Sequence, residues 1–425
     1  MPTMDRKEKT MICNYTQHDR LCACGKHHRV ETRFAVIQPG VLHDAKAYCR
    51  REGLTGISVV VYDQNTYAAT ADRHPAADRE IVLNPQGLHA NERGVEMLME
   101  RLTDDVGYLL AIGSGTVHDI TRYCAYRLGI PFVSCPTAAS VDGFCSSVAA
   151  MTWGGCKKTL TAVAPQFVLA DTDIIRQAPM RLTRSGYGDM VGKYVALADW
   201  RMAHILTGEY LCETIAGLTM DATKTVLDSA AGIRDGQPEA YESLIAGLLL
   251  SGIAMQLLSY SRPASGAEHH ISHLIETEPP GLGIHTTALH GEKVGVGTRL
   301  VSAAYHRLAE HPIRAFQDYV EPDKALIDRI FGEKLAPGIY EENRDDVARG
   351  ITGAQLSRCW PALRQVIETI PTPAALQTAY ATIGAVTCLS EIGVDEAKAP
   401  ELLRYAPLVR HRLTLLRLLP CFITE

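Results

Sequence analysis

Three short segments in the second half of the chain carry side chains that commonly bind divalent metal ions. Asp189 ends a Ser-Gly-Tyr-Gly-Asp run, and His290 is followed by Gly-Glu-Lys. His269 and His273 lie four residues apart, a spacing that places two side chains on one face of a helix. One carboxylate and two imidazoles form a mixed set that suits Zn²⁺ or a similar ion with an open coordination position. Histidines that bind no metal are also common, so the residues alone leave both interpretations open.

A glycine-containing turn in the first half of the chain is typical of dinucleotide binding. Gly113 and Gly115 follow an apolar run and precede a helical pattern. Glycines let the backbone approach a ligand closely, and the first N–H groups of a helix attract an anion such as pyrophosphate. His118 stands where the full G-x-G-x-x-G fingerprint has its third glycine. A simple strand-to-helix turn explains the segment equally well.

Two other segments follow apolar runs and could contact the same ligand. Asp63 stands where acidic residues often bind ribose hydroxyls, although a solvated turn would also place it there. A later loop contains four polar residues within ten positions, namely Thr137, Ser140, Asp142 and Ser146. Ligands bind at the carboxyl edge of open parallel sheets, whereas hydroxyls can also cap local helices. The residues alone do not decide between these roles.

The elements that would position these residues change character near residue 178. Before this point, four apolar runs predict buried parallel strands, at residues 56–63, 107–113, 130–135 and 167–171. Helical patterns alternate with these runs, which predicts a doubly wound α/β sheet. After residue 178 the pattern is helical nearly throughout. We therefore expect an N-terminal arm (1–34), a Rossmann-like dinucleotide-binding α/β domain (35–177) and an all-helical domain for metal and substrate (178–425).

The composition is that of a globular chain with more than one domain. Its 425 residues are 46% hydrophobic and 21% charged, which excludes disordered and fibrous classes. The net charge of −6 argues against nucleic-acid binding. No window reaches about 18 uninterrupted apolar residues, so we expect no membrane span, and residues 244–258 are interpreted as a buried helix. The N-terminus lacks the apolar core of a secretory signal. We expect a cytoplasmic protein.

The cysteines of the chain are interpreted as reduced thiols. There are twelve, which in a cytoplasmic protein do not predict disulfides. The run Cys22-Ala-Cys24-Gly-Lys-His27-His28, with Cys13 nearby, resembles a metal-binding segment but lacks a second Cys-x-x-Cys pair. We expect a reduced, flexible arm here, with a structural zinc site as the alternative.

Five motifs together resemble a known family. In chain order they are GSGTVHD, PTAASVDGFCS, SGYGDMVGKYVALADW, GAEHHISH and LHGEKVGVG. They resemble the bacterial branch of the sn-glycerol-1-phosphate dehydrogenases, within the iron-containing alcohol dehydrogenase superfamily, and the resemblance spans residues 36–420. It implies a dehydroquinate synthase-like fold and the reversible reduction of dihydroxyacetone phosphate to sn-glycerol 1-phosphate, a step of lipid metabolism. It also implies NAD(H) or NADP(H), one divalent ion (zinc or nickel) and a homodimer or larger homo-oligomer.

The resemblance also implies roles for individual residues. It makes Asp189, His269 and His290 the metal ligands; His285 is a rival for the third position but lacks the following Gly-Glu. Asp142 and His273 would contact the substrate, and Asp189 would do so through the metal. The dinucleotide would be held by Asp63, Gly113, Gly115, Thr116, Val117, His118, Asp119, Thr137, Ala138, Ala139, Ser140 and Ser146. His270 differs from the apolar residue usual at its position.

The reaction explains why such residues are needed. A metal ion would polarise the carbonyl and a nicotinamide would supply the hydride. His273 could relay the proton, because the unperturbed pKa of histidine lies near neutrality. Lys157 and Lys158 are our candidates for binding the substrate phosphate, unless they belong to a solvated turn. Glycerol or polyol dehydrogenation is the alternative enzyme activity; dehydroquinate synthase-like cyclisation and a non-enzymatic role are less favoured.

Overall fold

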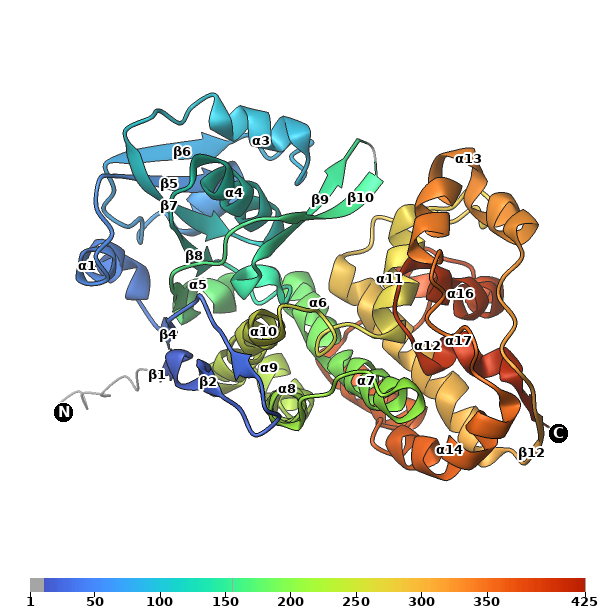
Figure 1. The fold of residues 1–425 in the computed structure, drawn as a ribbon. Helices are drawn as coiled ribbons and strands as arrows, with labels where there is room; N and C mark the ends of the chain where they lie inside the picture. Colours follow the sequence, from blue (N-terminus) through green and yellow to red (C-terminus); the bar gives the residue numbers. More distant parts are fainter. Residues whose placement is uncertain (1–10, 155, 425) are drawn as a thin grey trace, which may run out of the picture. The chain divides into compact units, whose positions relative to one another are not determined.

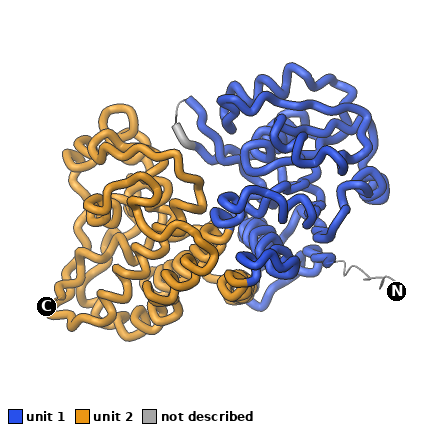
Figure 2. Tube along the Cα trace, turned by 180° about the vertical axis from the view of Figure 1, so that it is seen from behind, with its two compact units in different colours: residues 1–186, 232–260 blue, residues 187–231, 261–425 orange. Residues whose placement is uncertain are grey.

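A computed structural model describes residues 11–154 and 156–424 of the chain (Figure 1). The chain divides into two compact units (Figure 2). The first combines residues 1–186 with 232–260, and the second combines residues 187–231 with 261–425. The first unit contains a mostly parallel sheet and the second is almost entirely helical, so the predicted fold class is confirmed.

The first unit is built on a seven-stranded sheet in the order β1-β4-β11-β8-β7-β5-β6. All neighbours pair in parallel except β1, which runs antiparallel to β4. The strands are β1 (Met11–Asn14), β4 (Phe34–Gln38), β5 (Ile57–Asp63), β6 (Arg79–Leu83), β7 (Val106–Gly113), β8 (Phe132–Pro136) and β11 (Val168–Asp171). Because β5, β7 and β8 are parallel neighbours, their carboxyl ends form one edge, where ligands of such sheets bind.

Helices cover both faces of this sheet, which explains why its strands are apolar without alternation. Val59 and Val61 of β5 belong to a core with α3 (Glu92–Met99) and α4 (Gly115–Leu128). Val60 and Tyr62 belong to the core of the opposite face, with α1 (Ala45–Arg51) and α5 (Thr172–Gln177). The short helix α2 (Gln64–Ala69) follows β5 directly.

Helix α10 (Pro238–Leu258) belongs to the first unit, although it lies far along the chain. Among the described residues it is the one helix whose length and composition would allow it to cross a membrane, and 67% of its most apolar window is buried inside the protein. Gly252 lets it approach the turn at residues 142–145, since a Cβ there would lie 2.9 Å from the Cβ of Cys145. The helix therefore packs as a core element.

Two small antiparallel hairpins complete the first unit. One joins β9 (Val148–Trp153) to β10 (Cys156–Thr161), and the other joins β2 (Arg20–Leu21) to β3 (His27–His28). Residues 11–34, which the sequence suggested to be a flexible arm, are thus arranged as a sheet strand followed by a hairpin.

The second unit is a helical assembly around one large apolar core. Its core residues come from helices along the whole unit, including Val195, Ile271, Val301, Leu363 and Leu402. The helices of this part of the chain, with those at its boundaries, are α6 (Met180–Val191), α7 (Lys193–Thr207), α8 (Glu213–Asp228), α9 (Ala230–Arg234), α11 (Ala267–Thr277), α12 (His290–Glu310), α13 (Lys324–Glu342), α14 (Gly353–Ile367), α15 (Pro373–Ile383), α16 (Ala399–Tyr405) and α17 (Leu415–Leu418). Strands β12 (Ile313–Phe316) and β13 (Phe422–Thr424) pair in a small antiparallel sheet in the same unit.

Candidate metal centre and nucleotide-binding edge

Glycines set the spacing of the three helices that carry the candidate metal ligands. A Cβ on Gly188 of α6 would lie 2.5 Å from the carbonyl oxygen of Gly291 in α12. A Cβ on Gly297 would lie 2.7 Å from the carbonyl oxygen of Glu268 in α11. Such distances leave room for a hydrogen atom only, so α12 meets both neighbours backbone to backbone. The glycines of the GYGD and HGEKVGVG motifs therefore bring the ligand-bearing ends together.

Asp189, His269 and His290 form one cluster in the second unit. Each offers a ligand atom, and these atoms lie within 4.8 Å of one another. Nε2 of His269 lies 3.5 Å from Oδ1 of Asp189, and the ring centroids of His269 and His290 are 5.3 Å apart. Two imidazoles and one carboxylate at this spacing match the three protein ligands of a catalytic divalent metal site.

Two glutamates orient the imidazoles of this cluster. Oε1 of Glu268 lies 2.6 Å from Nδ1 of His269, and Oε1 of Glu276 lies 2.9 Å from Nδ1 of His290. A carboxylate on Nδ1 fixes the ring orientation and leaves Nε2 for the metal, as in most histidine metal sites. The donor set and both carboxylate partners thus fit one divalent ion.

Lys193 adds a positive charge beside the cluster. Its Nζ lies 2.8 Å from Oδ1 of Asp189. Burial alone would disfavour the carboxylate, but Lys193 and His269 hold the pKa of Asp189 well below its usual range. Burial and Lys193 oppose a proton on His269, whereas the hydrogen bonds with Asp189 and Glu268 raise its pKa to about 9. Asp189 is therefore ionised, as a metal ligand must be.

His273 lies on the same helix face as His269, as the four-residue spacing predicted. Its ring centroid lies 6.0 Å from that of His269 and 6.1 Å from that of His290. Nε of Arg410 donates to its Nδ1 at 3.3 Å. Burial, and then the charge of Arg410, hold the pKa of His273 well below its usual range. His273 is therefore a neutral ring with its proton on Nε2.

The two other histidines of these motifs lie outside the cluster. The side chain of His285 is 80% exposed, and its Nδ1 lies 2.8 Å from Oε1 of Glu278. It is therefore not the third member of the cluster. His270 is completely buried, and burial together with Arg412 holds its pKa well below its usual range. As a neutral ring it occupies the place of the expected apolar side chain.

The glycine turn of the first unit is a close strand-to-helix connection. Gly113 ends β7 and Gly115 begins α4. A Cβ on Gly113 would lie 2.6 Å from the Cβ of Val117, whereas one on Gly115 would meet Val141 only at 3.6 Å. Thr116 and Asp119 lie in the first turns of α4. The turn presents the start of a 14-residue helix at the carboxyl edge of the sheet, as a pyrophosphate site needs.

His118 and Arg122 support this turn from inside. Nδ1 of His118 lies 3.0 Å from the carbonyl oxygen of Ser114, and Nε2 lies 2.8 Å from Oγ of Ser134. Burial, with Arg122 nearby, lowers the pKa of His118 to about 3, so the ring is neutral. Arg122 is buried and donates to the carbonyl oxygens of Gly143, Phe144 and Val148. Both side chains thus serve to hold the backbone of the edge.

The loop after β8 lies against the glycine turn. The N–H of Thr137 donates to the carbonyl oxygen of Gly113 at 2.9 Å, and the hydroxyls of Ser114 and Ser140 lie 2.7 Å apart. Ala138 and Ala139 are buried between these polar residues. Oδ2 of Asp142 accepts from Ser251 of α10 at 2.9 Å, and Oγ of Ser146 accepts from the N–H of Val148 at 3.1 Å. The structure therefore brings these predicted residues to one edge.

Asp63 ends β5, next to β7, and caps helix α2. Its Oδ1 accepts from the N–H of Thr66 at 2.8 Å, and the Thr66 hydroxyl accepts from the N–H of Asp63 at 3.0 Å. This capping box is a local role that the sequence analysis did not foresee. The carboxylate is only partly buried, so its second oxygen is compatible with a ribose contact.

The two predicted phosphate-binding lysines lie on strand β10. Lys158 pairs in register with Met151 and is exposed. Lys157 pairs with Thr152, and its side chain is not among the parts of the chain that the structure describes. The hydrogen bond from Gly154, and more weakly the charge of Lys158, lowers the pKa of Glu92. Lys158 thus has an acidic neighbour in its own unit.

Sequence reasoning missed four charged residues of the candidate metal centre. Glu268 directly precedes a predicted ligand, and Lys193 follows Asp189 by four residues, so adjacency and helical spacing were available signals. Glu276 lies seven residues after His269 on the same helix. Arg410 lies 137 residues from its partner His273, and nothing local in the sequence points to it.

Comparison with known proteins assigns this fold to a class. The sequence model described as iron-containing alcohol dehydrogenase matches residues 36–179. The structure resembles an iron-containing alcohol dehydrogenase from Corynebacterium glutamicum (TM-score 0.59, 15% identity, 94% of this chain and 96% of that one). It also resembles a sulfoacetaldehyde reductase from Bifidobacterium kashiwanohense solved with NAD+ (TM-score 0.58, 14% identity, 89% and 91%). The fold is that of the iron-containing alcohol dehydrogenases.

Sequence relatives narrow this class to one family. A glycerol-1-phosphate dehydrogenase (NAD(P)+) of Geobacillus stearothermophilus is 33% identical over 410 residues, which cover 94% of each chain. An enzyme of the same name from Thermococcus kodakarensis is 35% identical over 286 residues, 66% of this chain and 80% of that one. The chain belongs to the glycerol-1-phosphate dehydrogenase family. The predicted family and the predicted class of enzyme, an oxidoreductase, are confirmed.

Proposed function

We propose that this protein reduces dihydroxyacetone phosphate reversibly to sn-glycerol 1-phosphate with NADH or NADPH. The observation that carries the proposal is the cluster of Asp189, His269 and His290, with a glutamate on the Nδ1 of each imidazole. Its relatives, named glycerol-1-phosphate dehydrogenases (NAD(P)+), support the choice of substrate and cofactor. We also propose a cytoplasmic enzyme that forms a homodimer or larger homo-oligomer.

Asp189, His269 and His290 would hold the metal ion, for which zinc or nickel is our choice because imidazole suits both. A bound ion would polarise the substrate carbonyl while the nicotinamide supplies hydride. Glu268 and Glu276 keep the two imidazoles in the orientation that binding requires. Lys193 keeps Asp189 ionised.

His273 would stabilise the negative charge that develops on the substrate oxygen. Because Arg410 donates to Nδ1, the N–H of the neutral ring is at Nε2. From the helix turn next to His269, this N–H would donate a hydrogen bond to the oxygen that gains negative charge. The proton that completes the hydroxyl would come from solvent water, because a neutral imidazole that gave up its own proton would become an imidazolate. This role rests on the tautomer and the position of the ring, since the neutral form prevails.

The substrate phosphate needs a cation, and the second unit offers Arg410. Its guanidinium contacts His273 through Nε, which leaves further N–H groups for a phosphate. Lys157 and Lys158 remain our first-unit candidates for the same role. Asp142 would contact the substrate hydroxyl, and the residues at the carboxyl edge of the sheet, from Gly113 to Asp119 and from Thr137 to Ser140, would hold the dinucleotide.

One assay tests the proposal. The zinc- or nickel-loaded protein is mixed with NADH or NADPH and either dihydroxyacetone phosphate or dihydroxyacetone, and loss of reduced-cofactor absorbance is followed. We expect a much higher kcat/KM for the phosphate and a product that an enantiomer-specific assay identifies as sn-glycerol 1-phosphate. Equal or better turnover of dihydroxyacetone would favour the alternative, a glycerol or other polyol dehydrogenase.

A further inference from the structure

The hairpin formed by β2 and β3 has almost no apolar core of its own. Of residues 16–31, only His28 is buried, and the large apolar side chain of Leu21 is 70% exposed. A two-stranded hairpin without a packed face is only marginally stable in water. Something other than hydrophobic burial must therefore hold these residues in place.

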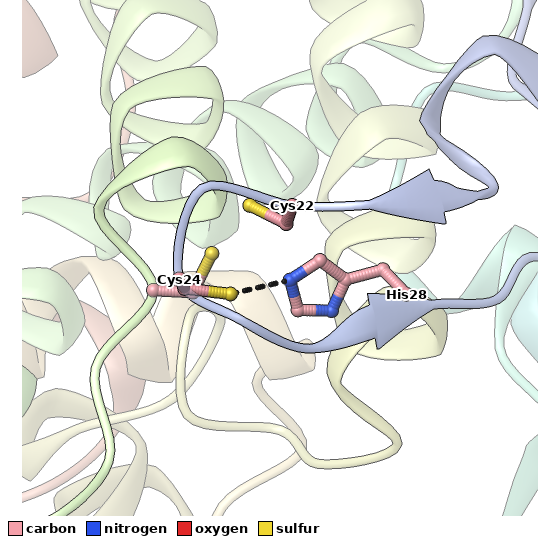
Figure 3. Close-up of side chains that lie close together, drawn as sticks. Cys22, Cys24 and His28 are labelled. Carbon is pink, nitrogen blue, oxygen red and sulfur yellow. Dashed lines mark hydrogen bonds between the residues drawn. The ribbon is translucent and has the colours of Figure 1, made fainter.

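The tip of the hairpin turns two cysteines toward one histidine (Figure 3). The N–H of Cys22 donates to the carbonyl oxygen of Lys26, and Gly25 adopts a left-handed φ of 84° that closes the turn. Sγ of Cys24 lies 3.3 Å from Nε2 of His28. The ligand atoms of Cys22, Cys24 and His28 all lie within 4.8 Å of one another. Tetrahedral zinc separates its sulfur and nitrogen ligands by about 3.5–3.8 Å, so small movements would suffice.

His28 has the hydrogen bond at Nδ1 that is typical of metal-binding histidines. Its Nδ1 lies 2.8 Å from the carbonyl oxygen of Leu257, at the end of the core helix α10. This hydrogen bond places the ring proton on Nδ1 and leaves the Nε2 lone pair facing the thiols. Nearby, Gln256 accepts hydrogen bonds from the N–H groups of Glu31 and Thr32. His28 therefore connects the hairpin tip to a rigid element of its own unit.

We propose that Cys22, Cys24 and His28 bind a structural zinc ion, which fastens the N-terminal hairpin to helix α10. Thiolate and imidazole are the ligands that zinc prefers in structural sites, and two thiol protons would be released on binding. The hairpin supplies three ligands, and a fourth donor completes the tetrahedron. His27, which sequence reasoning had grouped with these cysteines, is not part of the site: its side chain is 53% exposed and lies near Asp19. Cys13 lies apart from it in β1.

Cobalt substitution of the full-length protein tests this site separately from the candidate catalytic one. Only the hairpin site contains thiolates, so Co²⁺ bound there produces thiolate-to-cobalt charge-transfer absorption, whereas Co²⁺ at Asp189 does not. We expect this absorption in the wild type and in Asp189→Ala. We expect it to be lost in the double variant Cys22→Ser/Cys24→Ser and changed in His28→Gln. Cys13→Ser is the matched control and should keep it.

Metal content provides a second readout that does not depend on variants. The zinc-loaded wild type should hold one zinc per chain beyond the catalytic equivalent, and a thiol-directed mercurial should release that one first. Zinc loss should also make the peptide bonds of residues 16–31 accessible to protease. Absence of the charge-transfer absorption in the wild type would overturn the proposal. So would a Cys22–Cys24 disulfide found by mass spectrometry of the protein purified under reducing conditions.

Discussion

Nζ of Lys193 donates a hydrogen bond to Oδ1 of Asp189 at 2.8 Å, and both side chains are completely buried. Removing one partner of a buried ion pair leaves the other charge uncompensated. A metal ion at Asp189 would bring a second positive charge to the same carboxylate. The stability of the second unit should therefore depend on Lys193 more strongly without metal than with it.

Lys193→Met tests this dependence. We expect it to lower the free energy of unfolding of the metal-free protein by about 3–5 kcal/mol, the usual cost of breaking a buried pair. Zinc should restore part of that loss, because it supplies the missing charge. Urea unfolding with and without zinc measures both values. Equal destabilisation in the two states would show that no metal binds at Asp189.

The three candidate ligands can be tested individually. Asp189→Ala, His269→Ala and His290→Ala should each lose the catalytic metal and nearly all activity, because an open site with three protein ligands has none to spare. His285→Ala is the matched control, since that exposed ring lies outside the cluster. Elemental analysis of each purified variant measures its metal content, and a turnover assay measures its remaining activity. A variant with full metal content and wild-type turnover would remove its residue from the site.

Much of this architecture could be predicted from local sequence patterns, and some of it could not. Apolar runs and the glycine turn predicted strands β5, β7, β8 and β11, because they encode burial and backbone geometry within a few residues. Strands β1, β4 and β6 of the same sheet were not predicted. The partnership of Arg410 with His273 and the packing of α10 in the first unit depend on tertiary contacts between distant segments. The capping role of Asp63 was missed because turn and helix cap share the same residue preferences.

Two sets of cationic side chains, Arg410 and the pair Lys157 and Lys158, are candidates for binding the substrate phosphate, and variants of each set can distinguish between them. If Arg410 binds the phosphate, Arg410→Met should weaken the binding of dihydroxyacetone phosphate by about 2–5 kcal/mol more than the binding of dihydroxyacetone. Turnover of both substrates should fall as well, because Arg410 also sets the tautomer of His273. If Lys157 and Lys158 bind it, their double alanine variant should show that selective loss instead. The KM values for both substrates, measured on both proteins, separate these cases. An equal effect on both KM values would assign a variant's residues to another role.

Asp63 should bias the enzyme toward NADH, because its carboxylate would repel the 2′-phosphate of NADPH. Asp63→Asn keeps the helix cap, since asparagine caps helices as well as aspartate does, and removes the charge. We expect the ratio of kcat/KM values to move toward NADPH with little change in stability. Asp63→Ala serves as a control for the cap and should cost about 1 kcal/mol of stability. An unchanged cofactor ratio in Asp63→Asn would place Asp63 away from the adenosine.

Asp199 should make the stability of the second unit depend on pH. Burial raises its pKa to about 7, although the N–H groups of Leu415 and Ala267 and the hydroxyl of Tyr305 favour the ionised form. The unfolded carboxyl has a pKa of about 3.9, so between about pH 4 and 7 the folded state keeps a proton that the unfolded state releases. Stability should therefore fall as pH rises through this window, by up to about 1.4 kcal/mol per pH unit.

Asp199→Asn isolates this effect. The difference in unfolding free energy between wild type and variant should shrink or reverse as the pH rises toward neutrality, because the variant cannot titrate. Urea unfolding at several pH values gives the two slopes. Parallel slopes would mean that Asp199 is ionised in the folded protein throughout.

The glycine contacts that join α6, α11 and α12 affect how much folded enzyme a cell contains when the metal is scarce. Because backbone meets backbone at Gly188 and Gly297, the ligand-bearing helix ends are brought together by the folding of the chain itself. A cell starved of the catalytic metal would then accumulate enzyme whose second unit is folded but inactive. When the metal returns, capacity would recover at the speed of ion uptake, without new protein synthesis.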